Sequence, residues 1–329
     1  MSFVRRKVGT YDSGPMNEPV RIAIVGAGNV GATFAYSLVL SGLASEIVLI
    51  DMDQARAEGQ AMDLDHAVPF NRPVRVWAGN YDDCKGALVT MVSAGASQRP
   101  GEGRMDLLKR NIAVFRNVIG EIATVNPEGI ILVATNPVDV LTYAAYKISG
   151  LSRRRVFGSG TILDTARFRT LLANHFDVDP RSLHAHIIGE HGDSEVPVWS
   201  LANIAGVRFA DLAGEGWPKV ESEAMEEIFL KTRDAASHII ERKGATYYAV
   251  ASGLLRIVEA IVRDQSTVLS VSSLLTGQYG VSDVCLSLPT VINRRGVARV
   301  LQLGLDGTEI EKLTHSARIV STNIAELGL

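Results

Sequence analysis

The sequence predicts an α/β protein in which a doubly wound parallel sheet is followed by an α+β domain. Two observations support this prediction. Short apolar runs of strand length alternate with segments of helix length through the first half of the chain. The second half has longer charged helices and alternating segments typical of antiparallel strands. We therefore expect a flexible leader at residues 1–19, a nucleotide-binding domain at 20–160 and a substrate or catalytic domain at 161–329.

A glycine-rich turn follows the first apolar run, Val20 to Val25. Gly26, Gly28 and Gly31 form the pattern G-x-G-x-x-G, and an apolar helical segment begins directly after the turn. Side chains at these positions would block the tight turn, the approach of a pyrophosphate to backbone N–H groups, and close packing of the helix on the sheet. The pattern therefore predicts a dinucleotide site.

An acidic residue ends the next predicted strand. Asp51 follows the apolar run Glu46 to Ile50 and stands twenty positions beyond Gly31, which completes the βαβ unit of a Rossmann domain. A carboxylate there accepts hydrogen bonds from the adenosine ribose and repels a 2′-phosphate, so we expect NAD rather than NADP. The alternative is a glycine-rich turn that binds nothing, and the strand, helix and acid around it disfavour that interpretation.

The remaining elements follow in order along the chain. In the first half we expect strands at residues 75–78, 88–93, 129–135 and 156–160, and helices at 54–66, 105–125 and 141–148. In the second half we expect helices at 162–175, 219–242, 246–263 and 306–326, and strands at 184–188, 267–275 and 284–292. Six strands with helical connections complete two mononucleotide-binding halves, so the first domain should end near Gly160.

The composition excludes several classes of function. Hydrophobic residues are 47%, charged residues 21% and the net charge is -3, so neither nucleic acid nor an anionic membrane is expected as a partner. No apolar run approaches the length of a membrane span, and the basic residues near the start precede no signal-peptide core. Cys84 and Cys285 alone make neither a disulfide framework nor a metal site. We expect a cytoplasmic protein without a metal.

Four side chains are candidates for proton transfer and substrate binding. His191 lies between glycines in the loop GEHGDSE, and an imidazole titrates near neutrality, although a capped surface histidine is the plain alternative. Asp164 and Arg167 share a helix face at spacing i,i+3, where a solvated ion pair is also common. Arg104 follows two glycines in a polar loop after a strand, so it is a candidate lid cation or an ordinary surface arginine.

The sequence resembles the L-lactate and malate dehydrogenase superfamily, and within it the bacterial L-lactate dehydrogenases, from Val20 to the last helix. The motifs that carry the resemblance occur in the family's order: GAGNVG, AEGQAMDLDHA, GASQRPGEGR, VATNPVDVLTY, GSGTILDTARFR, IIGEHGDSEVPVW and KGATYYAVA. The resemblance implies reversible NADH-dependent reduction of pyruvate to L-lactate, as in glycolytic fermentation, by a homotetramer.

The resemblance also implies a role for each candidate residue. His191 is the proton donor and acceptor, Asp164 orients it, and Arg104 polarises the substrate carbonyl as its loop closes. The expected substrate-binding residues are Gln98, Arg104, Asn136, Arg167 and Thr246, with Arg167 gripping the carboxylate in a bidentate pair. The expected NAD-binding residues are Gly26, Gly28, Val30, Gly31, Asp51, Arg56, Tyr81, Gly95, Ala96, Asn117, Ala134, Thr135, Asn136 and Ser159.

Gln98 is expected to decide the substrate. Malate dehydrogenases of the superfamily commonly carry an arginine at this loop position, which pairs with a second carboxylate. The neutral Gln98 would leave the second carboxylate of oxaloacetate unpaired in a closed site. Arg99 would compensate if the loop register shifted by one. A malate or longer-chain 2-hydroxy acid dehydrogenase is therefore the alternative.

Arg169 and His184 match the positions at which allosteric bacterial lactate dehydrogenases bind fructose 1,6-bisphosphate across a subunit interface. The resemblance thus implies activation by that effector, and two ordinary interface residues are the alternative.

Gly103 departs from the family pattern, which usually has Ser or Thr directly before the loop arginine, Arg104. An NAD-requiring glycosidase would need a metal-binding cysteine that residues 135–137 lack, and a non-enzymatic relative should have lost one of the four candidate groups.

Overall fold

The computed structural model describes residues 19–96, 101, 103–212, 217 and 221–329. The leader up to residue 18, Gln98 and the side chain of Arg104 lie outside the described residues. The roles assigned to these three parts of the chain therefore stay predictions.

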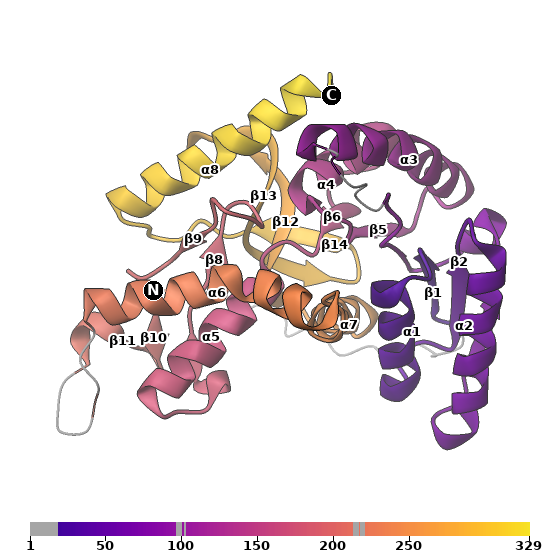
Figure 1. Ribbon diagram of the computed structural model, residues 1–329, viewed down its shortest axis with the longest axis horizontal. Helices are drawn as coiled ribbons and strands as arrows, with labels where there is room; N and C mark the ends of the chain where they lie inside the picture. The colour runs from indigo at the N-terminus through magenta and orange to yellow at the C-terminus, as the bar shows by residue number, and fades with distance from the viewer. Residues whose placement is uncertain (1–18, 97–100, 102, 213–216, 218–220) are drawn as a thin grey trace, which may run out of the picture.

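One large twisted sheet runs through the described chain (Figure 1). Its strand order is β14-β13-β12-β6-β5-β4-β1-β2-β3. The first six strands in the chain are parallel, and the last three pair antiparallel. The strands of this sheet are β1 (Arg21–Val25), β2 (Glu46–Ile50), β3 (Arg75–Ala78), β4 (Val89–Val92), β5 (Ile130–Val133), β6 (Val156–Gly158), β12 (Thr267–Thr276), β13 (Ser282–Asn293) and β14 (Gly296–Val300).

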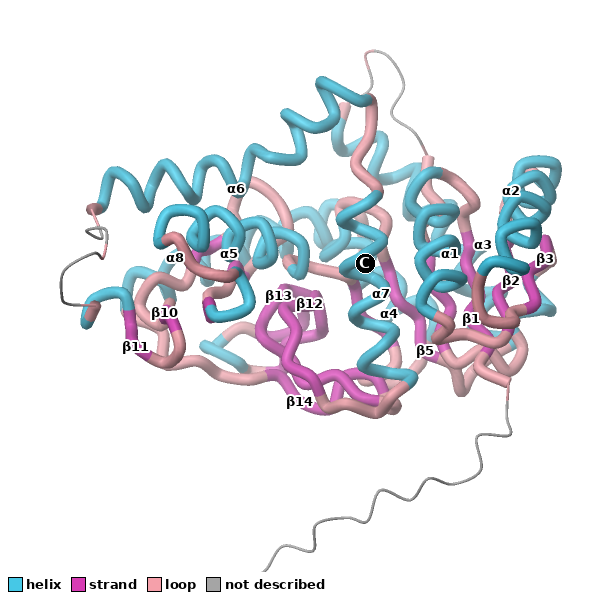
Figure 2. Tube along the Cα trace, turned by 90° about the horizontal axis from the view of Figure 1, so that it is seen from below, coloured by secondary structure: helices cyan, strands magenta, loops and turns pink. Residues whose placement is uncertain are grey.

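Helices cover both faces of the sheet (Figures 1 and 2). They are α1 (Asn29–Ser41), α2 (Gln54–Ala67), α3 (Arg104–Val125), α4 (Val138–Ser149), α5 (Ile162–Phe176), α6 (Ser222–Lys243), α7 (Tyr248–Val262) and α8 (Gly307–Glu326). Five short strands form a three-stranded sheet of order β11-β10-β7 and a two-stranded sheet of β8 and β9: β7 (Leu183–His184), β8 (Ile187–Ile188), β9 (Val196–Pro197), β10 (Asn203–Ile204) and β11 (Val207–Arg208).

The parallel strands are buried on both faces because each contributes side chains to two separate cores. In β1, Ile22 and Ile24 face the core under α1, α2 and α7, whereas Ala23 and Val25 face the core under α3, α4 and α8. All four are at most 2% exposed. A strand between two helical layers therefore has a continuously apolar sequence. The predicted mixed α/β fold with a Rossmann sheet is confirmed.

The antiparallel strands continue the same sheet instead of forming a separate one. Ser272 of β12 pairs with Gly158 of β6, so strands from both halves of the chain meet in the middle of the sheet. The proposed boundary near Gly160 thus falls in a turn where the sheet is continuous. The division of the chain into two domains remains a prediction.

One predicted strand is corrected by the structure. Residues 184–188 do not form one strand, because Leu183–His184 pairs with β10 whereas Ile187–Ile188 pairs with β9. Between them, the carbonyl of Ala185 accepts a hydrogen bond from Arg169 Nε at 2.9 Å. The chain therefore changes partners in the middle of the run, which an apolar alternation cannot reveal. Strand β14 was also not predicted, since it is short and Arg299 interrupts its apolar pattern.

Candidate active site

The glycine turn between β1 and α1 has the geometry that its pattern predicts. Gly26 has φ +108°, and a Cβ at Gly31 would lie 1.8 Å from the carbonyl oxygen of Gly26. Both positions therefore exclude a side chain for reasons internal to the fold. A Cβ at Gly28 would meet no atom within 4 Å, so this glycine leaves open space above the helix start.

The beginning of α1 has the properties of an anion site. Gly28 is its N-cap, no side chain caps the helix, and its first turn contains no acidic residue. The first backbone N–H groups of a helix carry partial positive charge and lack partners within the helix. Together with the open space at Gly28, these groups fit the pyrophosphate of a dinucleotide.

Asp51 closes the turn from the neighbouring strand. Its Oδ2 accepts a hydrogen bond from the N–H of Ala27 at 2.7 Å, and its Oδ1 accepts one from Asp53 N–H at 2.9 Å. The carboxylate is thus fixed beside the glycine turn while it keeps further acceptor sites. That position fits the ribose contact predicted for it.

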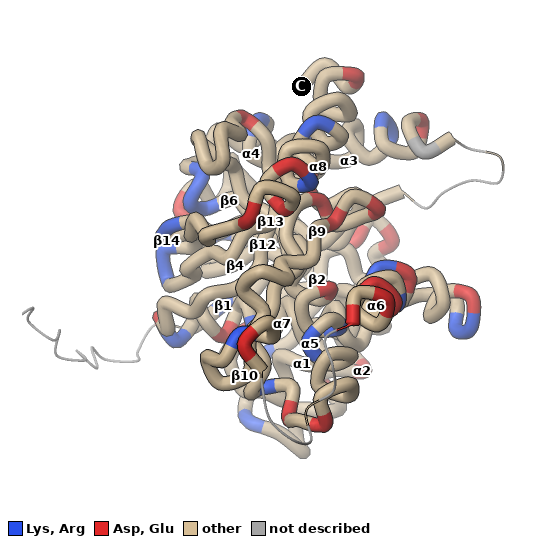
Figure 3. Tube along the Cα trace, turned by 90° about the vertical axis from the view of Figure 1, so that its left-hand side faces the viewer, with Lys and Arg blue, Asp and Glu red and all other residues tan. Residues whose placement is uncertain are grey.

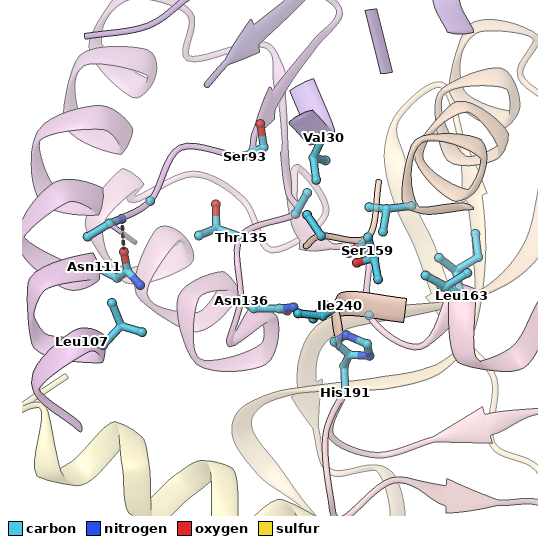
Figure 4. A pocket seen from close by; sticks show the side chains of 18 of the residues that line it. Val30, Ser93, Leu107, Asn111, Thr135, Asn136, Ser159, Leu163, His191 and Ile240 are labelled. Carbon is cyan, nitrogen blue, oxygen red and sulfur yellow. Dashed lines mark hydrogen bonds between the residues drawn. The ribbon is translucent and has the colours of Figure 1, made fainter. Parts of the chain in front are cut away.

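A pocket of about 390 Å³ lies at the carboxyl ends of the parallel strands (Figure 4). Eight of the predicted cofactor and substrate residues line it, together with the proposed proton donor His191: Val30, Gly95, Ala96, Ala134, Thr135, Asn136, Ser159 and Thr246. Ligands of doubly wound sheets bind at this edge. The sequence did not predict the other residues that line it: Ser93, Leu107, Asn111, Gly160, Ile162, Leu163, Ile240, Gly244, Ala245 and Val250.

Two side chains hold the strand ends around this pocket. Asn111 of α3 is 2% exposed, and its Oδ1 accepts a hydrogen bond from the N–H of Ala96 at 2.7 Å, drawn in Figure 4. Thr135 Oγ1 donates to the carbonyl of Ala94 at 2.8 Å. The sequence signal available for Asn111 was a polar amide within an amphipathic helix, because an asparagine that is buried there needs a hydrogen-bond partner.

His191, Asp164 and Arg167 form a continuous hydrogen-bonded chain beside the pocket. Nδ1 of His191 lies 2.5 Å from Oδ2 of Asp164, and Nη1 of Arg167 donates to Oδ1 of the same carboxylate at 3.1 Å. The side chains are 23%, 3% and 13% exposed, respectively. His191 lines the pocket, whereas Arg167 is not among the residues that line it. The carboxylate therefore bridges a ring that faces the pocket and a guanidinium behind it.

The electrostatics of these three side chains favour the charged form of the His191 imidazole. Burial opposes the charge, but the adjacent Asp164 carboxylate outweighs it through charge and hydrogen bonding, with the net result that the pKa of His191 is raised to about 9. Burial, followed by the charge of Asp164, raises the pKa of Glu195 to about 8. Burial thus favours the neutral form of Glu195, and the charges of His191 and Arg167 oppose this effect.

Asp139 fixes the backbone of the His191 loop, a role that the sequence did not suggest. Its Oδ2 accepts a hydrogen bond from His191 N–H at 2.7 Å, and its Oδ1 accepts one from Ser272 Oγ at 2.6 Å. Asp139 is 2% exposed, and burial raises its pKa to about 6. An acidic residue at an otherwise apolar helix start was the signal available in the sequence.

The other predicted cofactor residues lie outside this pocket. Arg56 is exposed and pairs with Asp53 at 3.6 Å at the start of α2. Tyr81 is half-buried, and its pKa is raised mainly by burial and partly by charges that include Asp51. Asn117 is exposed on α3. Their roles remain predictions.

The two predicted effector residues lie near each other. Arg169 is half-buried and lines a separate pocket of about 440 Å³ with His186 and Arg256. Burial, followed by the charges of Arg169 and His184, lowers the pKa of His186 to about 4. The lowered pKa keeps His186 neutral at pH 7, so the positive charge at this cavity comes from Arg169 and from Arg256, which pairs with Glu259 at 2.9 Å. His184 is exposed.

Neither a metal centre nor a membrane span is found in the part of the chain that the structure describes. No three His, Cys, Asp or Glu residues there are grouped so as to hold a metal ion. No described helix is long and apolar enough to cross a bilayer.

Comparison with known proteins places these features in one family. The lactate/malate dehydrogenase NAD-binding domain matches residues 20–158, and the family's α/β C-terminal domain matches residues 161–327. The L-lactate dehydrogenase of Thermoanaerobacter sp. (strain X514) is 51% identical over 312 residues, which cover 94% of this chain and 99% of the relative.

Solved structures agree with the sequence relatives. The minor L-lactate dehydrogenase of Enterococcus mundtii in its ligand-bound form is 38% identical, with a TM-score of 0.91 over 94% of this chain and 98% of that one. A lactate dehydrogenase from a Medee basin deep-sea metagenome library is 42% identical, with the same TM-score over 94% and 99%.

Proposed function

The chain belongs to the lactate/malate dehydrogenase family, and on that premise we propose that it acts as an NAD-dependent L-lactate dehydrogenase. The observation that carries the proposal is the hydrogen-bonded series from Arg167 through Asp164 to His191, whose ring faces a pocket lined by residues of both halves. His191 supplies a proton donor in the pocket, and Arg167, bonded to the same carboxylate, supplies a cation for a substrate carboxylate, as reduction of a 2-keto acid requires.

NAD fits the residues present at the glycine turn and the strand ends. The first N–H groups of α1 would hold the pyrophosphate, Asp51 the adenosine ribose, and Val30, Thr135 and Ser159 would line the nicotinamide end of the cleft. When bound, NADH supplies the hydride that adds to the keto carbon of pyruvate.

His191 would supply the proton of the reaction. The raised pKa keeps its ring protonated at neutral pH, so Nε2 can hold the keto oxygen and then donate to it as negative charge develops there. Asp164 fixes the ring through Nδ1, and Asp139 fixes the backbone that carries the ring. In lactate oxidation the same ring, once neutral, accepts the proton from the hydroxyl.

Arg167 would bind the substrate carboxylate. One of its N–H groups is occupied by Asp164, which holds the planar guanidinium in place and leaves its other donors for a bidentate contact. By resemblance, Arg104 would polarise the carbonyl, while Asn136 and Thr246, which both line the pocket, would contact the substrate.

Gln98 would give pyruvate preference over oxaloacetate because it offers no cation for a second carboxylate. The test compares kcat/KM for pyruvate and oxaloacetate in the wild type and in Gln98→Arg. We expect pyruvate to be preferred by the wild type, and the substitution to shift preference toward oxaloacetate by about a hundredfold, or about 2.7 kcal/mol. A wild type that prefers oxaloacetate would overturn the substrate assignment and favour a malate dehydrogenase.

We also propose activation by fructose 1,6-bisphosphate at Arg169 and His184. The positive charge of Arg169 at its pocket supports an anion there, and like charges meeting across a homotetramer interface would repel until a bisphosphate neutralised them. Arg169→Gln should abolish the lowering of pyruvate KM by the effector while leaving saturated turnover intact. An unchanged response would exclude this site.

The cellular role would be the fermentation of glycolytic pyruvate to lactate in the cytoplasm. Regeneration of NAD by this reaction would couple the enzyme to the glycolytic steps that reduce NAD. A bisphosphorylated sugar that activates the enzyme would match lactate production to the supply of glycolytic intermediates.

A further inference from the structure

The edge of the large sheet at the amino ends of its parallel strands, opposite the NAD pocket, carries an unusual concentration of arginine. Two sequence segments supply it, SRRR at residues 152–155 before β6 and NRRGVAR at residues 293–299 around β14. Figure 3 shows the basic residues gathered beside β14. We define Arg153, Arg154, Arg155, Arg294, Arg295 and Arg299 as the arginine edge. It forms in a chain whose formal net charge is -3.

A close backbone contact joins the two segments. Val297 N–H donates to the carbonyl of Arg154 at 2.8 Å. Gly296, at φ +84°, makes this approach possible, since a Cβ there would lie 2.1 Å from the same carbonyl oxygen. The fold therefore holds the two arginine runs against each other despite the repulsion between like charges.

Little negative charge offsets the arginine edge. Arg155 pairs with Glu128 at 2.6 Å, Asp264 accepts only the backbone N–H of Arg294, and Arg153 donates to Thr276 Oγ1 at 2.8 Å. Among the described residues, the exposed side chains of Arg154, Arg295 and Arg299 have no hydrogen-bond or ion-pair partner. Their donors are available to a ligand.

Two pockets are recessed into the arginine edge. One of about 350 Å³ is lined by four arginines, by Glu128, which pairs with Arg155, and by Leu88, Ile130 and Ser152; the arginines are Arg154, Arg155, Arg294 and Arg295. The other, of about 190 Å³, is lined by Arg153, Arg154 and Arg299 among others. Arg154 lines both, so one extended anion can place negative groups on either side of its guanidinium.

From these observations we propose that the arginine edge binds a small oligophosphate, a compact chain of phosphoryl groups such as a tripolyphosphate or the phosphates of a nucleoside triphosphate. Guanidinium groups bind phosphate oxygens in bidentate pairs, and several adjacent phosphates match several unpaired arginines. No aromatic residue lines either pocket, so a stacking platform for single-stranded nucleic acid is missing from this part of the described structure.

This site differs in position from the NAD pocket and from the proposed effector site. The strand residues Leu88 and Ile130 and the neighbouring Arg155 stand at or just before the amino ends of β4, β5 and β6, whereas the NAD pocket lies at their carboxyl ends. The pocket that contains Arg169 shares no residue with either pocket of the arginine edge. The inference therefore does not depend on the proposed function.

Isothermal titration of the NADH-saturated protein with sodium tripolyphosphate tests the proposal, because NADH keeps the probe out of the cofactor pocket. We expect saturable binding that weakens as salt rises. Arg154→Gln should weaken it by about tenfold or more, and Arg295→Gln and Arg299→Gln should each weaken it less. Arg318→Gln, which removes an exposed arginine of α8 that lines neither pocket, and Arg169→Gln should leave binding unchanged.

The competing outcomes are distinct. Absence of saturable binding by the wild type at millimolar tripolyphosphate would overturn the proposal, as would binding that is lost in Arg169→Gln and retained in Arg154→Gln. A second titration with ATP distinguishes the source of the phosphates. Equal affinity for both probes would support recognition of the phosphate chain alone, whereas tighter binding of ATP would support an added nucleoside contact at Leu88 and Ile130. Unchanged pyruvate turnover in Arg154→Gln would verify that the variant is folded.

Discussion

The two halves of the chain contribute to the active-site pocket in different ways. The residues up to Gly160 that line the described pocket offer backbone, amide, hydroxyl and apolar groups, and none of them has a side chain that titrates near neutral pH. The second half contributes His191, with Asp164 and Arg167 behind it. Among the described residues that line the pocket, the one side chain that titrates near neutral pH thus comes from the second half. Substitutions at the glycine turn and at Asp51 should change binding of the dinucleotide, whereas substitutions of His191 and Asp164 should change turnover.

The largest effect is expected for His191→Asn. The variant keeps a polar side chain but has no group that can donate a proton as an imidazolium does, so kcat for pyruvate reduction should fall by about 10² to 10⁴. NADH affinity, measured by fluorescence titration, should be unchanged. A parallel loss of NADH binding would show that the two halves are not separable.

Asp164→Asn should lower turnover less and should also move its pH dependence. In the wild type, His191 is protonated below pH about 9, so pyruvate reduction should decline as pH rises through about 9. Removing the carboxylate leaves burial, which favours the neutral ring, and the decline should begin at lower pH. At neutral pH we expect kcat to fall by about tenfold to a hundredfold.

The control for this variant is the reverse reaction. Lactate oxidation needs the neutral His191 ring, so its rate should increase as pH rises through the pKa of the ring. In Asp164→Asn this increase should move to lower pH by the same amount as the decline of pyruvate reduction. If the limbs for reduction and oxidation move in opposite directions, Asp164 does not act through the protonation of His191.

Asp51→Asn tests the first half while keeping one of its two fold contacts, because the amide nitrogen cannot accept the hydrogen bond of Asp53 N–H. The amide oxygen can still accept the hydrogen bond of Ala27 N–H, while the charge that repels a 2′-phosphate is gone. Discrimination against NADPH should decrease by about tenfold, or about 1.4 kcal/mol. The ratio of kcat/KM for NADH and NADPH measures this change, and kcat with NADH should stay near the wild-type value.

Two glycine variants sharpen the distinction between fold and binding within the first half. Gly31→Ala should lower the melting temperature, because its Cβ would overlap the carbonyl of Gly26. Gly28→Ala has room for its Cβ in the free protein, so its melting temperature should not change. Its NADH affinity should fall by about tenfold, since the methyl group would occupy the space left for the pyrophosphate. Unchanged NADH affinity would place the pyrophosphate elsewhere.

The two halves also differ in how well their structure could be predicted from sequence. The first βαβ unit was predicted to within a few residues because each signal in it is local: an apolar strand, glycines fixed by sterics, and an acid at the next strand end. The strands of the second half were predicted less well. Residues 184–188 change pairing partners, and β12 joins β6 through Ser272 and Gly158, which are far apart in sequence.

The same limit applies to the candidate site. Spacing alone placed Asp164 and Arg167 on one helix face, but the contact of Asp164 with His191 spans 27 residues and was implied only by the resemblance. The hydrogen bond from His191 N–H to Asp139 connects α4 to a loop 52 residues away. Such contacts are products of tertiary packing, and a single sequence does not encode them in any local pattern.

Direct titration of the His191 imidazole by NMR tests the central claim, with its resonance assigned by its loss in His191→Asn. We expect a pKa near 9 in the wild type. In Asp164→Asn we expect a pKa clearly below 9, since the contributions of Asp164 are gone and burial is then opposed only by the smaller charge effects of Asp139 and Glu195. A wild-type pKa at or below about 6.5, or one that does not change in Asp164→Asn, would contradict the role assigned to this pair.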